Sequence, residues 1–280
     1  METQKRVAIQ GVAGAFHEVA ARRFFGENIT TVECDTFRIL SQRLHEGEAD
    51  FALMAIENTI AGTLMPNYSL VREFDLKIVG EVYLHIQMQL MVLPGVRLEQ
   101  VQYVHSHHIA IAQCREYLDT LKGVTVVEKN DTAEAAQQLV NQNLTNAAAI
   151  AGEQAAKLYG LEVITPNIHT YKQNFTRFFV LSRTAQPPPE GTTNKTSLCF
   201  ELEHRSGSLA EVLMLFAING INLTKIQSVP ILQKPYQYSF FVDLEWDDVH
   251  LYRSVMRRCE EKVANFNLLG EYERKSLIFN

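Results

Sequence analysis

The sequence contains few cysteines and no long apolar segment, and each shortage excludes a class of protein. Its four cysteines, Cys34, Cys114, Cys199 and Cys259, are far apart and form no Cys-x-x-Cys pair. They therefore predict reduced thiols in a cytoplasmic protein, and not a disulfide framework or a zinc site. No apolar run approaches the roughly 18 to 20 residues that a membrane-spanning helix needs. The polar start leads directly into a strand pattern, so we also expect no signal peptide.

An excess of positive charge is also absent. The net charge is -6 and the isoelectric point is near 5.9, whereas a nucleic-acid-binding protein normally presents a basic face. Three histidines, His105, His107 and His108, are nearly contiguous, but no spaced partner such as H-x-x-x-H accompanies them. This spacing does not suit a metal site, so we expect no bound metal ion.

The 280 residues, 46% of them hydrophobic, suffice for one large domain or two ordinary ones. Up to residue 185, short strands and helices alternate, which predicts an α/β fold with mostly parallel sheets. We assign residues 1–185 to this domain, with lobe one at about 1–80 and 165–185 and lobe two at about 81–164. Two lobes whose polar strand ends face each other would form a cleft for a small ligand.

A proline-rich break, which we assign to residues 186–195, precedes a second unit at 196–280. The strand and helix patterns of this unit follow the order β-α-β-β-α-β, which is the ferredoxin-like plan. Small sheets of this kind usually leave a face or an edge to a partner, so we expect a homo-oligomer. The plan alone does not determine a function.

The most informative segment is the polar stretch that leads into the apolar strand 178–181. Asn174, Thr176 and Arg177 can all hydrogen-bond an anion or a leaving hydroxyl group. A buried strand directly behind them would hold these groups rigidly. The alternative is an edge strand with an arginine on the surface, and the stretch alone does not decide between the two.

Polar residues also follow other predicted strands. Residues 57–63 come directly after the apolar strand 51–56, where open α/β sheets place ligands, and the alternative is a helix cap followed by a loop. Ser106 and His107 precede a helix that carries Gln113, and a helix N-terminus favours an anion. The turn at 11–16 could bind an anion through its backbone N–H groups or could be a plain tight turn.

Together these segments resemble prephenate dehydratase with a C-terminal ACT regulatory domain, over nearly the full length of the chain. Four blocks carry the resemblance: Gly11-x-x-Gly14-x-Phe16, Ile56-Glu57-Asn58-Thr59-x-x-Gly62, Ser106-His107 with Gln113-Cys114, and Asn174-x-Thr176-Arg177-Phe178. There are also departures from the pattern of the family. Thr59 replaces a serine, His108 and Ile109 replace Pro-Gln, and His17 stands where serine or threonine is common.

The resemblance implies a periplasmic-binding-protein-like catalytic domain that dehydrates and decarboxylates prephenate to phenylpyruvate in phenylalanine biosynthesis. Such a reaction forms an aromatic ring, so it needs no metal or redox cofactor. The family's key groups fall on Thr176, Asn58 and Gln113. We assign substrate binding to Glu57, Thr59, Gly62, Ser106, His107, Arg177 and Phe178. Cys114 is expected to have no role as a nucleophile, because the reaction needs none.

For the second unit, the resemblance implies feedback inhibition by phenylalanine at a dimer interface of the ACT domain, in a homodimer or homotetramer. The expected effector-binding residues are Gly207, Ser208, Leu209, Asn222, Leu223, Gln227, Ser228 and Pro230. The block from Gln227 to Pro230 lacks the acidic and basic residues of the family pattern. Two alternatives remain at this point: a two-lobe binding module without chemistry, and a dehydratase that acts on arogenate, the amino analogue of prephenate.

Overall fold

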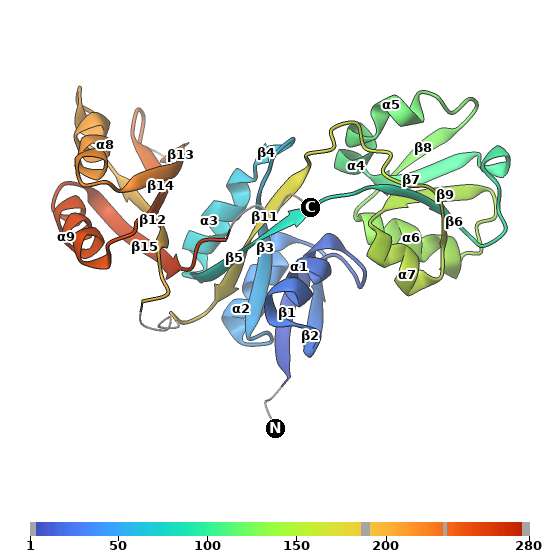
Figure 1. Cartoon of the computed structure of the whole chain (residues 1–280), viewed down its shortest axis with the longest axis horizontal. Coiled ribbons are helices and arrows are strands. Elements are labelled where there is room, and N and C mark those ends of the chain that lie inside the picture. Colours follow the sequence, from blue (N-terminus) through green and yellow to red (C-terminus); the bar gives the residue numbers. More distant parts are fainter. Residues whose placement is uncertain (1–3, 186–190, 232–233, 276–280) are drawn as a thin grey trace. The chain divides into compact units, whose positions relative to one another are not determined.

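The computed structural model describes residues 4–185, 191–231 and 234–275, and the chain forms two compact units. The first unit contains residues 1–74 and 82–183, and the second contains residues 75–81 and 184–280. Half of the predicted proline-rich linker, residues 186–190, lies outside the described residues. Each unit is described separately below (Figure 1).

The first unit is built on two sheets, each with its own helices. The first sheet has the strand order β2-β1-β3-β11-β5, with the short β4 paired to β3. Its strands are β1 (Lys5–Gln10), β2 (Ile29–Cys34), β3 (Phe51–Asn58), β4 (Gly62–Thr63), β5 (Lys77–His85) and β11 (Phe175–Ser182). Its helices are α1 (Phe16–Phe25), α2 (Phe37–Glu46) and α3 (Met65–Glu73).

Local signals explain the helices of this sheet. α2 begins after Thr36, whose hydroxyl accepts a hydrogen bond from the Ile39 N–H at 3.2 Å, and it ends at Gly47 in the left-handed conformation. No helix was predicted at α3, whose sequence contains Pro66. In the structure this proline occupies the first turn of α3, where its missing N–H costs nothing.

The second sheet of the first unit has the order β10-β6-β9-β7-β8. Its strands are β6 (Gln89–Val92), β7 (Tyr103–His107), β8 (Thr125–Lys129), β9 (Ala147–Ala151) and β10 (Glu162–Thr165). Its helices are α4 (His108–Gln113), α5 (Arg115–Leu118), α6 (Thr132–Asn141) and α7 (Glu153–Tyr159), with a 3-10 turn at Leu98–Gln100. Asp131 caps α6 by accepting hydrogen bonds from the N–H groups of Ala133 and Glu134.

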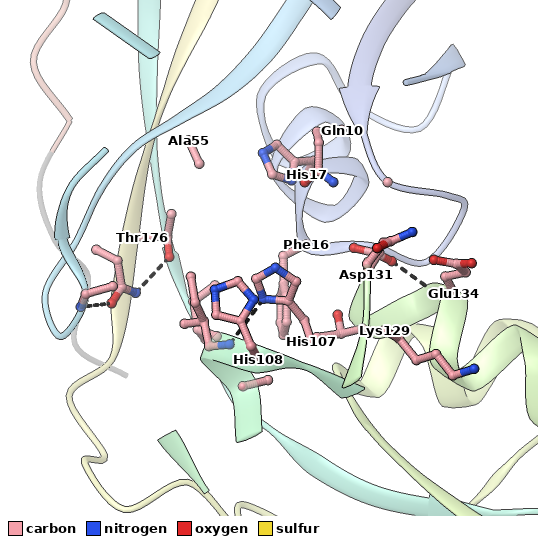
Figure 2. Close-up of a pocket in the computed structure, with 18 of the residues that line it drawn as sticks. Gln10, Phe16, His17, Ala55, His107, His108, Lys129, Asp131, Glu134 and Thr176 are labelled. Carbon is pink, nitrogen blue, oxygen red and sulfur yellow. Dashed lines mark hydrogen bonds between the residues drawn. The ribbon is translucent and has the colours of Figure 1, made fainter. Parts of the chain in front are cut away.

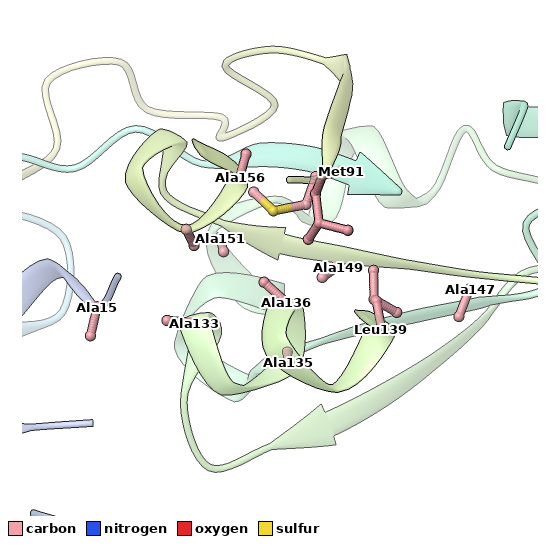
Figure 3. Packing of buried hydrophobic residues seen from close by; sticks show 12 residues of the cluster. Ala15, Met91, Ala133, Ala135, Ala136, Leu139, Ala147, Ala149, Ala151 and Ala156 are labelled. Atoms are coloured by element: carbon pink, nitrogen blue, oxygen red, sulfur yellow. The ribbon is translucent and has the colours of Figure 1, made fainter. Parts of the chain in front are cut away.

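Alanine dominates the core under α6 and α7 (Figure 3). Small side chains let these helices approach β9 closely, and close packing is what makes a core sensitive to added volume. Ala15, which precedes α1, belongs to the same buried cluster, so the turn before α1 packs against the second sheet. The buried alanines of the cluster are Ala15, Ala133, Ala135, Ala136, Ala147, Ala149, Ala151, Ala155 and Ala156.

The prediction of mostly parallel sheets was wrong, because both sheets are mixed. β1 pairs in parallel with β2 and β3, but β11 runs antiparallel to β3. In the second sheet, β7 is parallel to β8 and β9, whereas β6 is antiparallel to β9 and β10. The chain passes from the first sheet to the second between β5 and β6 and returns between β10 and β11. The antiparallel strands β6, β10 and β11 flank these two passages.

The second unit has the predicted order β-α-β-β-α-β. Its elements are β12 (Lys195–Glu201), α8 (Ser208–Ile218), β13 (Asn222–Pro230), β14 (Tyr238–Glu245), α9 (Val249–Glu260) and β15 (Ala264–Tyr272). The sheet is antiparallel in the order β13-β14-β12-β15, which leaves β13 at an edge. Asp248 caps α9 by accepting hydrogen bonds from the N–H groups of His250 and Leu251.

Two further observations concern the whole described chain. None of the helices in the described ranges is both long and apolar enough to cross a membrane. All four cysteines lie within these ranges, are buried and take part in no disulfide.

Candidate active site

The first unit contains a cleft of about 1160 Å³ whose lining comes from elements of both sheets (Figure 2). The first sheet supplies Asn58, Thr176 and Phe178, and the second supplies His107 and Gln113. The three residues predicted to be catalytic therefore line one cleft, although Asn58 and Thr176 are 118 positions apart in the sequence.

A chain of side-chain hydrogen bonds joins these three residues. Asn58 Nδ2 donates to Thr176 Oγ1 at 3.0 Å and to Asn174 Oδ1 at 2.7 Å. Asn174 Nδ2 in turn donates to Gln113 Oε1 at 2.9 Å. All four side chains are buried, so the chain is a preorganised polar network that links the first sheet to the second.

The side-chain amide of Asn58 both donates and accepts hydrogen bonds. Its Oδ1 accepts hydrogen bonds from the backbone N–H groups of Ile60 and Ala61, which fixes the turn after β3. The amide orientation is thereby set, and Nδ2 must face Thr176 and Asn174. Because the Thr176 oxygen accepts the bond from Asn58, the hydroxyl proton of Thr176 remains available for a ligand in the cleft.

An irregularity in β3 brings Ala55 and Asn58 to the same side. Thr176 pairs with Asn58 and Arg177 with Glu57, but Phe178 pairs with Ala55, so β3 contains one extra residue at Ile56. Ala55 and Asn58 both line the cleft although they are three positions apart. In a regular strand, residues separated by an odd number point to opposite faces.

Arg177 does not line the cleft, contrary to the prediction that it binds substrate. Thr176 and Phe178 face the cleft, so strand alternation turns Arg177 to the other face of β11. There the guanidinium lies over the rings of Phe179, at 4.9 Å, and Tyr83, at 5.9 Å. Glu57, the cross-strand neighbour of Arg177, does not line the cleft either.

Three more predicted substrate-binding residues lie outside the lining. The Ser106 hydroxyl donates to the carbonyl oxygen of Ile150 at 2.6 Å in the core. The Thr59 hydroxyl donates to the Gln173 carbonyl and accepts from the Phe175 N–H, both at 3.0 Å, so it secures the start of β11. Gly62 pairs with Asn58 in the β3–β4 hairpin. These residues support the site and do not form its surface.

Comparison with known proteins identifies the fold that carries this site. Residues 7–186 match the family described as "Prephenate dehydratase". The chain belongs to the prephenate dehydratase family. It is therefore an enzyme of the lyase class.

Individual relatives agree with the family assignment. The chain is 38% identical over 279 residues to "Arogenate dehydratase/prephenate dehydratase 2, chloroplastic" of Arabidopsis thaliana, a match that covers 95% of this chain and 72% of the relative. Among solved structures, prephenate dehydratase of Arthrobacter aurescens in complex with L-Phe has a TM-score of 0.86 and 28% identity, covering 96% of this chain and 90% of that one. A structure described as GqqA, "a novel type of quorum quenching acylases", has a TM-score of 0.87 and 31% identity, covering 97% and 98%.

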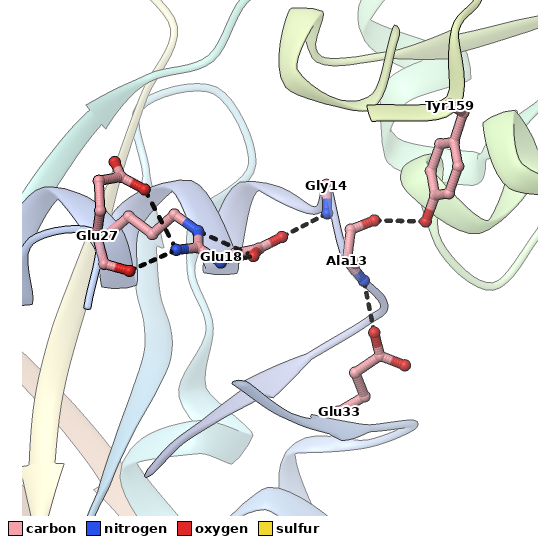
Figure 4. A network of polar contacts seen from close by, with 7 residues as sticks. Ala13, Gly14, Glu18, Glu27, Glu33 and Tyr159 are labelled. Atoms are coloured by element: carbon pink, nitrogen blue, oxygen red, sulfur yellow. Dashed lines mark hydrogen bonds and ion pairs between the residues drawn. The ribbon is translucent and has the colours of Figure 1, made fainter. Parts of the chain in front are cut away.

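Backbone N–H groups in the turn at residues 11–16 donate hydrogen bonds to carboxylates of the protein itself (Figure 4). The N–H of Ala13 donates to Glu33 at 2.7 Å and the N–H of Gly14 donates to Glu18 at 2.6 Å. These amides are therefore occupied, which favours the tight-turn interpretation over an anion site. The turn also contacts the second sheet's helices, because the Tyr159 hydroxyl donates to the Ala13 carbonyl at 2.6 Å.

Gly11 begins this turn, and a residue with a side chain would be strained at its position. Its φ of +97° lies in the left-handed region, and an added Cβ would lie 2.9 Å from Asp131 Oδ2. Asp131 also lines the cleft, and burial raises the pKa of its carboxyl group above the usual range. The turn and the start of α6 therefore approach each other closely at the rim of the cleft.

The two residues that flank α4, His107 and Cys114, have shifted pKa values. His107 caps α4 by accepting from the Ile109 N–H through Nδ1, and burial, with the neighbouring His108, lowers its pKa. The Cys114 thiol is completely buried, which raises its pKa to about 12. A thiol with such a pKa is not a nucleophile at neutral pH. Across the described ranges, no group of three or more His, Cys, Asp and Glu side chains is arranged to hold a metal ion.

The prediction omitted two residues that the structure brings to the site. Asn174 belongs to the polar stretch noted in the sequence, but its role as the link between Asn58 and Gln113 depends on a tertiary contact. His17 was noted only as a departure from the family pattern, yet it lines the cleft.

The predicted effector residues fall on two elements of the second unit. Gly207 is the left-handed residue before α8, and Ser208 and Leu209 are the first residues of that helix. The remaining effector residues lie along the edge strand β13: Asn222, Leu223, Gln227, Ser228 and Pro230. No residue of β13 is fully buried, so this strand is open to a ligand or a partner.

Proposed function

We propose that this enzyme converts prephenate into phenylpyruvate, carbon dioxide and water, a step of phenylalanine biosynthesis. The observation that carries the proposal is the chain of hydrogen bonds from Gln113 through Asn174 and Asn58 to Thr176, at the wall of a cleft large enough for a small dianion. Membership of the prephenate dehydratase family supports the same reaction.

The reaction needs help mainly with the departing hydroxyl group. The bond between the ring and its carboxylate breaks, carbon dioxide leaves, and the freed electron pair enters the ring while the C–O bond breaks. The leaving hydroxide takes up a proton and becomes water. Thr176 donates a hydrogen bond to this oxygen as negative charge develops on it, and Asn58 holds Thr176 in the required orientation.

The two carboxylates of prephenate require positive charge or hydrogen-bond donors. Lys129 lines the cleft at the end of β8. Among the lining residues that the structure describes, it is the only lysine or arginine. Gln113 can donate through its Nε2, since its Oε1 is occupied by Asn174. We therefore assign carboxylate binding to Lys129 and Gln113, in place of Arg177, Thr59 and Ser106.

The decisive experiment measures both candidate substrates. Purified enzyme is incubated with prephenate, and phenylpyruvate formation is followed. A parallel assay uses arogenate, which would give phenylalanine, and the two kcat/KM values are compared. We expect prephenate to be preferred. A larger kcat/KM for arogenate would reassign the substrate, and no turnover of either would refute the proposal.

The C-terminal unit supports a proposal about regulation. Its β-α-β-β-α-β order and antiparallel sheet suit an ACT domain, and the Arthrobacter aurescens structure that matches nearly the whole chain is a complex with L-Phe. We assign phenylalanine to the start of α8 and to β13, where the effector residues lie. The open edge of β13 suits a second copy of the chain, so we propose a cytoplasmic homodimer or homotetramer.

The similarity to the acylase structure gives a second candidate, hydrolysis of an amide bond. Such hydrolysis normally uses an activated nucleophile or a metal-bound water. Thr176 accepts its hydrogen bond from an amide, not from a base, and Cys114 is buried with a raised pKa. An amide-hydrolysis assay beside the prephenate assay tests this alternative directly.

A further inference from the structure

His17 occupies a distinctive position in the wall of the cleft. It lies in the first turn of α1, and its ring packs edge-on against Phe178 at 5.0 Å between centroids and at a tilt against Phe37 at 5.5 Å. Phe178, Thr176 and His17 all line the cleft, and Figure 2 draws the His17 ring among the lining side chains. The aromatic contacts fix the plane of the imidazole.

The His17 ring has a buried nitrogen that no group of the described chain satisfies. The side chain is 9% exposed, and Nε2 has no hydrogen-bond partner. A buried polar atom without a partner costs on the order of 1–3 kcal/mol, so such atoms in native proteins call for an explanation. Nε2 itself is closed to solvent, so a bound ligand supplies the missing partner only after a small shift of the His17 ring or of its lining neighbours.

The charge state of His17 restricts what this partner can be. Burial lowers the pKa of His17 to about 3, so the ring is neutral at physiological pH. A neutral imidazole offers one N–H donor and one acceptor nitrogen. Apart from the hydroxyl proton, the polar groups of prephenate are acceptor oxygens, which require a donor.

We propose that His17, as the neutral tautomer protonated on Nε2, donates a hydrogen bond to an oxygen of the substrate and so positions it against Thr176. This inference rests on the proposed function, because it takes prephenate as the ligand. It adds to the site a residue outside the hydrogen-bond chain of Asn58, Asn174 and Gln113. It also gives the first turn of α1 a role in binding.

A structural explanation of His17 can be separated from a binding role with a matched control. His105 is also 9% exposed and also has a buried nitrogen, Nδ1, without a partner, but it does not line the cleft. We therefore compare His17→Phe with His105→Phe. Both changes remove the polar nitrogens and retain an aromatic ring.

The comparison measures kcat, KM and Tm for each variant with prephenate. His17→Phe should lower kcat/KM about 10- to 100-fold, mainly through a higher KM, because a hydrogen bond to the bound substrate is lost. The loss should be the same at pH 6 and pH 8, since the neutral ring does not titrate there. His105→Phe should keep kcat/KM within about twofold. A folded His17→Phe enzyme with unchanged kcat/KM would overturn the proposal.

A measurement on the wild-type enzyme avoids dependence on the folding of a variant. The 15N resonance of His17 Nε2 is followed by NMR while phenylpyruvate, the proposed product, is added. Binding should shift this resonance, and saturation without a shift would contradict the contact. Loss of turnover in the wild-type assay would refute the proposed function itself, whereas wild-type turnover with an unaffected His17 would refute only this inference.

Discussion

The amide nitrogen of Asn58 donates a hydrogen bond to the hydroxyl oxygen of Thr176 at 3.0 Å, across neighbouring antiparallel strands. The two residues are directly paired in the β3–β11 register, so backbone hydrogen bonding holds the side chains together. The hydroxyl proton of Thr176 is thereby directed away from Asn58. In the proposed reaction, this pair would direct the hydroxyl proton of a weakly acidic threonine toward the leaving hydroxide.

Removal of the Thr176 hydroxyl tests this role. Thr176→Ala should lower kcat for prephenate by about 10²- to 10³-fold, on the order of 3–4 kcal/mol of transition-state stabilisation. Thr176→Ser retains the hydroxyl group and should recover most of that loss. Both are measured by phenylpyruvate formation, with Tm as the control for folding. An alanine variant with wild-type kcat would remove Thr176 from the mechanism.

The variant Asn58→Asp separates the hydrogen bonds that the Asn58 side chain donates from those that it accepts. The new carboxylate can still accept from the N–H groups of Ile60 and Ala61, but it can no longer donate to Thr176 and Asn174. We expect kcat to fall about 10²-fold. KM should also rise, because the added negative charge repels a dianionic substrate. The turn after β3 should remain, so far-UV circular dichroism should match the wild type. Activity within threefold of the wild type would show that donation by Asn58 is unimportant.

Cys114 is adjacent to Gln113, yet its thiol should be dispensable. It is completely buried and its pKa is raised to about 12, so the thiolate is absent at neutral pH. Cys114→Ser should keep kcat within about threefold, although the buried hydroxyl should lower Tm by a few degrees. The assay is phenylpyruvate formation at saturating prephenate. A folded variant without activity would assign chemistry to this sulfur.

His17 should make stability depend on pH in a definite direction. Its folded-state pKa of about 3 lies below the unfolded value near 6.5, so the unfolded chain binds the proton more readily. Stability from this group is complete above pH 6.5 and is lost as pH falls toward 3. At pH 5 the loss should be about 2 kcal/mol. Urea unfolding at pH 5 and pH 7.5 should show a smaller pH effect in His17→Phe; equal effects in both proteins would contradict this account.

Phenylalanine should inhibit the enzyme if the C-terminal unit is a regulatory domain. A coupling free energy of about 1–3 kcal/mol corresponds to a change of roughly 5- to 150-fold in apparent substrate affinity. Initial rates are measured with millimolar phenylalanine, with glycine as a control amino acid that lacks the ring. Binding should also raise Tm. Neither a change in rate nor a change in Tm would refute the regulatory proposal and leave the catalytic one intact.

Local sequence patterns were sufficient for much of the fold. The cap at Asp131, the cap at Asp248 and the order of elements in the second unit all follow from short-range signals. Strand direction did not follow, because pairing in β11 depends on how the chain returns from the second sheet. α3 was not predicted, and its Pro66 lies in the first helical turn, where a proline is compatible with a helix.

The site was predictable in its residues but not in all their orientations. Thr176, Asn58 and Gln113 line one cleft as expected. Strand alternation could have placed Arg177 on the opposite face from Thr176, and that signal was overlooked. The partners of Ser106 and Thr59 are backbone groups distant in sequence, which no local pattern reveals. The link through Asn174 is likewise a tertiary contact.

The irregular pairing of β3 makes Ile56 an extra residue between two side chains of the cleft wall. Deleting Ile56 would leave Ala55 and Asn58 two positions apart, so regular alternation would keep both on the cleft face and Asn58 opposite Thr176. A strand that is one residue shorter at this point can therefore present the same pair of side chains to the cleft.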